Sequence, residues 1–127
     1  MGQLQSQYCK ACEENNPSLV RELLSKGADV NWSRRKDGWS GLHIAACGNY
    51  GELLELLLAQ TGVDVNIRTN EDRTPLMLAC MEGHDNLVRR LCQADWSTAE
   101  IRDQLKNTMI YYGWDNYIAD TSAHNRF

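Results

Sequence analysis

The sequence predicts an all-α solenoid in which short helix pairs stack side by side, and three observations favour this fold class. Residues 6–31, 40–66 and 74–96 resemble one another, with Ser6, Ser40 and Thr74 spaced 34 residues apart. Each segment carries apolar residues at helical spacing, and residues 52–59 contain five leucines, too many for a helix with one buried face. An internal repeat of this length is the signature of stacked helical units, because no unit can bury its apolar surfaces alone.

The first helix pair ends near residue 27. Residues 1–5 are expected to form a frayed end or the start of the first helix, with Tyr8, Ala11 and Cys12 on its inner face. Pro17 then begins the second helix, where its missing N–H costs no hydrogen bond, and Gly27 ends it. The predicted core stripe of this helix consists of Leu19, Val20, Leu23 and Leu24.

The second and third pairs repeat this plan. Ser40 is the expected N-cap of a short helix, residues 49–51 interrupt it, and residues 52–59 form the next helix. Thr74 and Pro75 provide a capping hydroxyl and a first-turn proline for the third pair. Its core stripe is predicted to contain Leu87, Val88 and Leu91.

Two long loops connect the pairs. In residues 31–40, the tight-turn pair Asp37-Gly38 follows three cationic residues and lies between two tryptophans. Tryptophan and arginine are over-represented among residues that carry binding energy, so this loop is a candidate recognition patch. The alternative is a solvated loop with one tryptophan lying on the next repeat. Residues 66–74 form the second loop, with mixed charge and no aromatic residue.

The repeat is lost after Trp96. Residues 97–100 read as a capping box, and Ile101, Leu105, Met109 and Tyr112 follow at helical spacing. Residues 97–118 are therefore predicted to cap the outer face of the third repeat, and residues 119–127 to form a flexible tail. A packed cap makes a monomer the expected state. The alternative is that the surplus aromatic residues form a docking or dimer surface.

Several position-matched motifs show that the chain resembles the ankyrin-repeat family over roughly residues 4–96. They are SGLHIA at 40–45, TPLMLA at 74–79, Gly83-His84, GADVN at 27–31 and GVDVN at 62–66. The resemblance implies three ankyrin-type repeats (about 4–36, 37–70 and 71–96) with β-hairpin-like loops, followed by the C-terminal capping helix. It also implies structural roles for Ser40, His43, Thr74, Pro75, Gly83 and His84.

Some residues depart from the family pattern. Repeat 1 has Asn15 where glycine is usual and Cys9 where the histidine is found. Repeat 2 has Gly41 in place of proline and one extra residue near Thr61. Repeat 3 has Met77 in place of histidine and lacks the Asp-Val-Asn exit.

The family resemblance also implies a function, that of a non-catalytic protein–protein interaction module without a cofactor. We expect a small intracellular adaptor or inhibitor that binds a folded partner through its loop tips and concave helix face. The sequence does not distinguish a resemblance to the ankyrin-repeat inhibitors of cyclin-dependent kinases from one to the regulators of actin-capping protein. The predicted protein-binding residues are Trp32, Arg34, Arg35, Lys36, Asp37, Trp39, Asn70, Glu71, Arg73, Met81 and Glu82.

Charge and hydropathy argue against two other classes of partner. The formal net charge of −4 disfavours general binding to nucleic acid or to an anionic membrane surface. No apolar run approaches the roughly 18 residues that a membrane-spanning helix requires. A protein partner is therefore the expectation, with neither nucleic acid nor a membrane.

The five cysteines favour a reducing compartment, either cytoplasm or nucleus, because their number is odd and their spacing is not that of a disulfide scaffold. We expect most of these thiols to fill small core positions, since a free cysteine behaves as a small hydrophobe. The alternative function is a thiol or metal protein that uses Cys9, Cys12, His43 and Cys47. A further possibility, implied by the resemblance, is that Asn31 and Asn66 are substrates of an asparaginyl hydroxylase.

Overall fold

The computed structural model describes residues 2–94 and 106–114, and its helices follow one another in pairs. A further helical stretch covers residues 106–111, and the described residues contain no strand. The bounds of the paired helices are α1 Gly2–Glu13, α2 Pro17–Ser25, α3 Gly41–Gly48, α4 Gly51–Leu58, α5 Pro75–Glu82 and α6 Asp85–Cys92.

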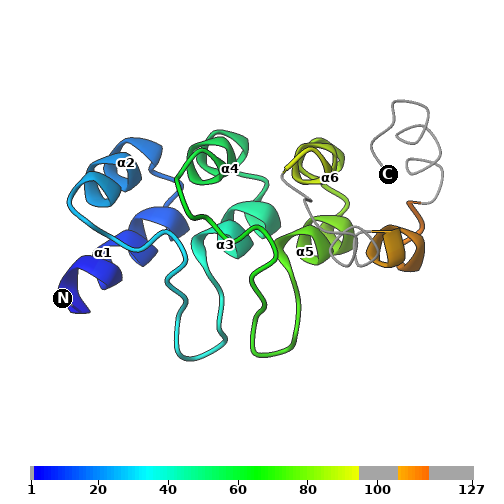
Figure 1. Ribbon diagram of the computed structural model, residues 1–127, viewed down its shortest axis with the longest axis horizontal. Helices are drawn as coiled ribbons and strands as arrows, with labels where there is room; N and C mark the ends of the chain where they lie inside the picture. The colour runs from blue at the N-terminus through cyan, green and yellow to red at the C-terminus, as the bar shows by residue number, and fades with distance from the viewer. Residues whose placement is uncertain (1, 95–105, 115–127) are drawn as a thin grey trace.

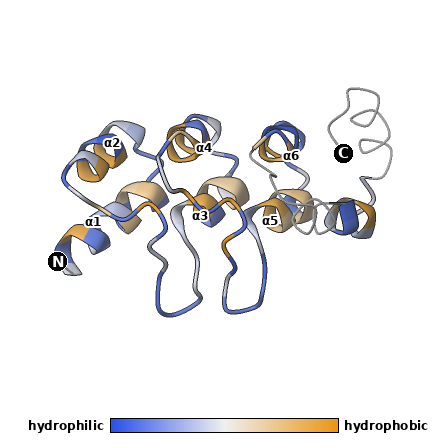
Figure 2. Ribbon diagram, viewed as in Figure 1, coloured by the Kyte–Doolittle hydropathy of each residue, from blue (hydrophilic) through white to orange (hydrophobic). Residues whose placement is uncertain are grey.

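The helices form two layers (Figure 1). Helices α1, α3 and α5 lie side by side in one layer, and α2, α4 and α6 lie over them in the second. Two long loops project from the α1/α3/α5 layer, and their residues are mostly hydrophilic (Figure 2). The predicted all-α solenoid with hairpin-like loops is therefore confirmed.

The core consists of equivalent residues from successive repeats. In the α1/α3/α5 layer, the equivalent alanines Ala11, Ala45 and Ala79 are fully buried, because only small side chains let neighbouring helices approach closely. In the α2/α4/α6 layer, the leucines at a second repeat position are buried as well, namely Leu23, Leu57 and Leu91. Burying each leucine stabilises the fold by about 2 kcal/mol relative to leaving it in water.

One member of the predicted core stripe is less buried than expected. Leu19 packs against the core but is only half-buried, whereas the equivalent Leu53 and Leu87 are fully buried. Leu19 lies on α2, which contacts α4 on one side only because α1 and α2 begin the stack. The end of a solenoid therefore keeps some apolar surface exposed.

The turns within the helix pairs also repeat. Asn15, Asn49 and Gly83 occupy the same repeat position, and their φ angles are +51°, +63° and +71°. Asparagine enters this left-handed region more readily than other residues with a side chain. This explains how Asn15 can replace the expected glycine without changing the turn.

The departure at Gly41 also has a structural reason. A Cβ atom at this position would lie 2.7 Å from the hydroxyl oxygen of Tyr8 and 3.2 Å from a methyl group of Leu57. Tyr8 is fully buried, and its hydroxyl donates a hydrogen bond to the carbonyl of Val30 at 3.0 Å. Repeat 1 thus places a tyrosine where the other repeats have leucine, and repeat 2 accommodates its hydroxyl with a glycine.

The C-terminal cap is only partly described. Met109 is fully buried, and its sulfur lies 3.8 Å from the thiol of Cys92 on α6, so the 106–111 helix packs against the last repeat. The predicted capping box at 97–100, Ile101, Leu105 and the tail 119–127 lie outside the described residues. The repeat boundaries and the extent of the cap remain predictions.

Candidate functional site

The first loop is organised around Arg34. The Arg34 guanidinium bonds both oxygens of Asp37, at 3.1 and 2.7 Å, and it also forms an ion pair with Glu13 of α1. It lies 5.4 Å from the centroid of the Trp39 ring, within the range of a cation–π contact. Ser33 and Ser40 form an antiparallel bridge at the base of the loop.

These contacts fix the ionisation of the loop. Hydrogen bonds to Asp37 raise the pKa of Arg34, although partial burial opposes the change. Burial alone would raise the pKa of Asp37, but the bonds from Arg34 and from the Trp39 N–H outweigh it and lower that pKa. Arg34 and Asp37 therefore remain charged, and the bonds between their side chains hold the loop in its conformation.

The two loops are joined at their tips. The Asn70 N–H donates to the carbonyl of Asp37 at 2.9 Å. Gly38 has a φ of +75°, and a Cβ atom there would lie 2.6 Å from the side-chain oxygen of Asn70. A glycine is needed for both reasons, and the first loop is thereby held against the second.

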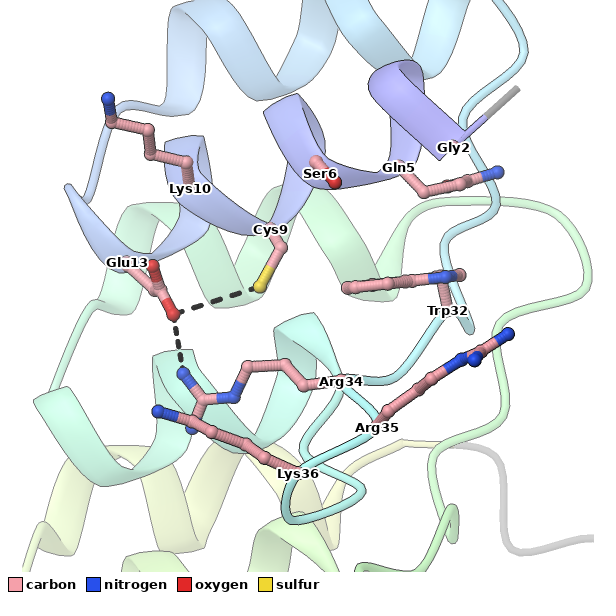
Figure 3. Close-up of a pocket in the computed structure, with 10 residues that line it drawn as sticks. All are labelled: Gly2, Gln5, Ser6, Cys9, Lys10, Glu13, Trp32, Arg34, Arg35 and Lys36. Atoms are coloured by element: carbon pink, nitrogen blue, oxygen red, sulfur yellow. Dashed lines mark hydrogen bonds and ion pairs between the residues drawn. The ribbon is translucent and has the colours of Figure 1, made fainter.

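A groove of about 770 Å³ runs between α1 and the first loop (Figure 3). The Cys9 and Glu13 side chains point from α1 toward the loop, whereas the ammonium of Lys10 points away from it. The groove is lined by Gly2, Gln5, Ser6, Cys9, Lys10, Glu13, Trp32, Arg34, Arg35 and Lys36.

The predicted binding residues differ in what they contact. Trp32 and Trp39 are half-buried and pack against the core, and Arg34 is held by its two carboxylate partners. In contrast, Arg35 and Lys36 are exposed and form no ion pair with any other described residue. In the second loop Asn70 and Glu71 are exposed, and Arg73 is half-buried at 4.0 Å from Glu71.

Equivalent residues at the ends of α1, α3 and α5 form a row beside the loops. Glu13, Cys47 and Met81 share one repeat position, and the Cys47 thiol lies 3.8 Å from a carboxylate oxygen of Glu82. Met81 is 43% exposed, which makes it one of the few large apolar side chains so accessible among the described residues. We call this row together with the two loops the loop-side face.

His43 connects the second and third repeats. It is fully buried, its Nδ1 accepts a bond from the Ser40 N–H at 3.0 Å, and its Nε2 lies 2.8 Å from the carbonyl of Arg73. The proton must then reside on Nε2, which donates to that carbonyl. Burial lowers the pKa of His43, so the ring is neutral at pH 7.

The other residues expected to have structural roles also lie at helix ends. The Thr74 hydroxyl accepts a bond from the Met77 N–H at 3.2 Å, and Pro75 occupies the first turn of α5. Gly83 ends α5, and His84 Nε2 lies 2.9 Å from the carbonyl of Cys47 in the preceding repeat.

Asn31 joins the first repeat to the second. Its amide nitrogen donates to the carbonyl of Gly62 at 2.9 Å, and its side-chain oxygen accepts from the Asp64 N–H at 2.8 Å. Both the nitrogen and the oxygen of the amide thus have partners within the protein. Modification of Asn31 and Asn66 by a hydroxylase stays a prediction.

The residues of the alternative thiol or metal site are not brought together as ligands. Burial raises the pKa of Cys12 to about 12, and burial and the Glu13 carboxylate raise the pKa of Cys9. Both ring nitrogens of His43 have partners within the protein. Within residues 2–94 and 106–114, no group of three His, Cys, Asp or Glu side chains could hold a metal ion.

Among the described residues, no helix is both long enough and apolar enough to cross a bilayer.

Sequence reasoning missed two features of the loop-side face. It named Arg34 as a residue that binds the partner and did not predict its pairing with Glu13, because that pairing joins residues 21 positions apart and depends on how the loop folds back. It also missed the α1 wall of the groove, including Gln5, Ser6 and Cys9. Their spacing of three or four residues on one helix face was the available signal, but nothing in the sequence shows that a loop covers that face.

The relatives that share part of this sequence include a channel, a rabankyrin and a ribonuclease. The potassium channel AKT1 of Oryza sativa subsp. indica is 38% identical over 79 residues, which are 62% of this chain and 8% of the channel. Rabankyrin-5 of Mus musculus is 31% identical over 114 residues, 81% of this chain and 10% of that protein. The 2-5A-dependent ribonuclease of Homo sapiens is 36% identical over 74 residues, 58% of this chain and 10% of the enzyme. The chain thus spans a tenth or less of the length of these relatives.

A family profile described as ankyrin repeats in three copies matches residues 9–105, which are most of the chain. Ankyrin repeats generally act as protein–protein interaction modules and are typically non-catalytic. The repeat spacing, the paired helices in two layers and the projecting loops agree with that match. The chain belongs to the ankyrin-repeat family.

Proposed function

We propose that this chain acts as an adaptor or inhibitor inside the cell and binds a folded partner protein through its loop-side face. The observation that carries the proposal is the alignment of exposed, chemically varied side chains from three repeats beside two linked loops. The stacked core lies behind them, so these residues can contact a partner without disturbing the fold.

The contact residues divide into two groups. Arg34 and Asp37 shape the first loop, and Trp32 and Trp39 contribute the parts of their rings that stay accessible. The exposed members of the predicted set make the direct polar and apolar contacts with the partner. They are Arg35, Lys36, Asn70, Glu71, Met81 and Glu82, with the half-buried Arg73 beside them.

The mechanism is one of steric and electrostatic complementarity. The loop-side face is held rigid by the Arg34 ion pairs and by the bond between the two tips, so little conformational entropy is lost on binding. Met81 offers an exposed apolar contact, and the charged residues of the face select the partner.

Photo-cross-linking from defined positions tests this proposal. A photoreactive phenylalanine analogue is introduced in cells at Lys36 or Met81 on the loop-side face, and at Arg21 or Glu52 on the outer helices as matched controls. All four positions are exposed, so the substitutions should leave the fold intact.

We expect the two loop-side positions to cross-link to the same discrete protein and the two control positions to leave that protein unlabelled. Labelling of the same protein from the outer helices alone would place the interface on the opposite layer. That outcome, or the absence of any discrete adduct from the loop-side positions, would refute the assignment.

A further inference from the structure

The groove between α1 and the first loop has more positive than negative charge (Figure 3). Its two carboxylates, those of Glu13 and the adjacent Asp37, both pair with Arg34. Arg35 and Lys36 are exposed and pair with no carboxylate among the described residues. Arg34 therefore pairs with both nearby carboxylates, and the side chains of Arg35 and Lys36 remain accessible to a ligand.

The floor of the groove is apolar and uncharged. The Trp32 ring lies between the α1 side chains and Arg35, half-buried and packed against the core. Cys9 also lines the groove, and because burial and Glu13 raise the pKa of that thiol, it is neutral at pH 7. Gln5 and Ser6 add polar groups along the wall formed by α1.

The groove is also preorganised. The α1 wall is a helix, and the loop wall is fixed by Arg34, by the bridge between Ser33 and Ser40, and by the bond from Asn70 to Asp37. A ligand that enters would find the cations and the indole already in place. Binding then avoids most of the cost of ordering a loop.

We propose that this groove binds an acidic, extended segment of a partner protein. Carboxylates of the segment meet Arg35 and Lys36, and an apolar side chain between them packs on the indole of Trp32. The proposal rests on the proposed function and names the chemistry of the partner. The argument is charge complementarity, since two accessible cations of the loop lie on the same groove as the accessible part of the Trp32 ring.

Two features favour a protein segment over a longer polyanion. The chain carries a net charge of −4, so charge away from the groove repels an extended anionic surface or strand. On the same face Glu82, beside Cys47, is an exposed carboxylate. A short acidic segment places its charges only where the cations are, which nucleic acid and membrane surfaces cannot do.

Selection from a phage-displayed library of short random peptides tests the inference with the intact protein. We expect enrichment of peptides that carry two or more carboxylates around an aliphatic or aromatic residue. The affinity of a synthetic enriched peptide is then measured by fluorescence polarisation for the wild type and three variants.

Arg35→Glu and Lys36→Glu should each weaken binding by about tenfold or more. Arg21→Glu is the matched control, because it makes the same charge change on an exposed residue of α2, outside the groove. It should change the affinity by less than about twofold, since surface charges beyond a Debye length are screened at physiological salt. Circular dichroism of each variant separates loss of binding from loss of fold.

The failure of this inference can be told apart from failure of the proposed function. If cross-links from Met81 persist while selection yields no acidic peptide, or yields peptides insensitive to both loop variants, the partner binds elsewhere on the loop-side face and the inference is wrong. Tighter binding of single-stranded RNA or phosphatidylserine vesicles than of the acidic peptide, lost in Arg35→Glu, would equally overturn it.

Discussion

His43 shows how one buried polar side chain can hold two repeats together. Its ring accepts a bond from the N–H of its own helix N-cap, Ser40, and donates one to the carbonyl of Arg73 in the next loop. Protonation would place a hydrogen on Nδ1, opposite the Ser40 N–H, and would create a buried charge. Both effects oppose the charged form, which agrees in direction with the lowered pKa.

Replacing His43 with glutamine therefore tests a pH-dependent contribution to stability. We expect His43→Gln to lower the free energy of unfolding by about 2 kcal/mol at pH 7, because two buried hydrogen bonds lose their geometry. The folded-state pKa lies below the ordinary value of 6.5, so the unfolded state binds the proton first as the pH falls. The stability that His43 provides is present above that value and is lost as the pH falls below it.

Urea denaturation of both proteins at about pH 7.5 and about pH 5.5 measures this difference. The gap between wild type and variant should shrink at the lower pH. A gap of equal size at both pH values would show that His43 does not titrate differently in the folded and unfolded states.

At the scale of the element, α1 and α3 can pack closely because Gly41 leaves room for the side chain of Tyr8. The Tyr8 hydroxyl occupies the space that a Cβ atom of residue 41 would need, and it satisfies the carbonyl of Val30. Neither residue can be explained from its own repeat, since each departs from its equivalents in a way that only the packed pair accounts for.

A double-mutant cycle measures this match. We expect Gly41→Ala to destabilise the protein by about 1–3 kcal/mol through overpacking, and Tyr8→Phe by about 1 kcal/mol or more through the lost hydrogen bond. In the double variant the overlapping oxygen is absent, so the combined loss in unfolding free energy should be smaller than the sum by about 1 kcal/mol. Additive losses would mean that the two side chains do not interact.

The pairing of Tyr8 with Gly41 also marks where prediction from the sequence stops. The helix pairs, their order and the buried leucine row could all be predicted, because they follow from residue spacing that repeats along the chain. The burial of Leu19 was overestimated, since spacing shows which face of a helix is apolar but not whether a neighbour covers it. The pairing of Arg34 with Glu13 was missed for a similar reason, because the path of a loop leaves no periodic signal.

At the scale of the whole molecule, the repeats depend on one another. Helix α4 contacts both α2 and α6, and α3 contacts both α1 and α5, so the second pair supports the first and the third. The hydrogen bonds of His43, His84 and Asn31 add polar links between repeats. The two loops that form the candidate binding face are held in register only while this stack is intact.

Hydrogen exchange of backbone amides in Leu57→Ala tests this dependence most directly. Leu57 is fully buried in the middle repeat, and its truncation should cost about 2–5 kcal/mol of unfolding free energy. If the stack is one cooperative unit, amides of α2 and α6 should lose protection together with those of α4. Loss of protection confined to α4, with α2 and α6 protected as in the wild type, would show that the repeats fold independently and would contradict a single stack.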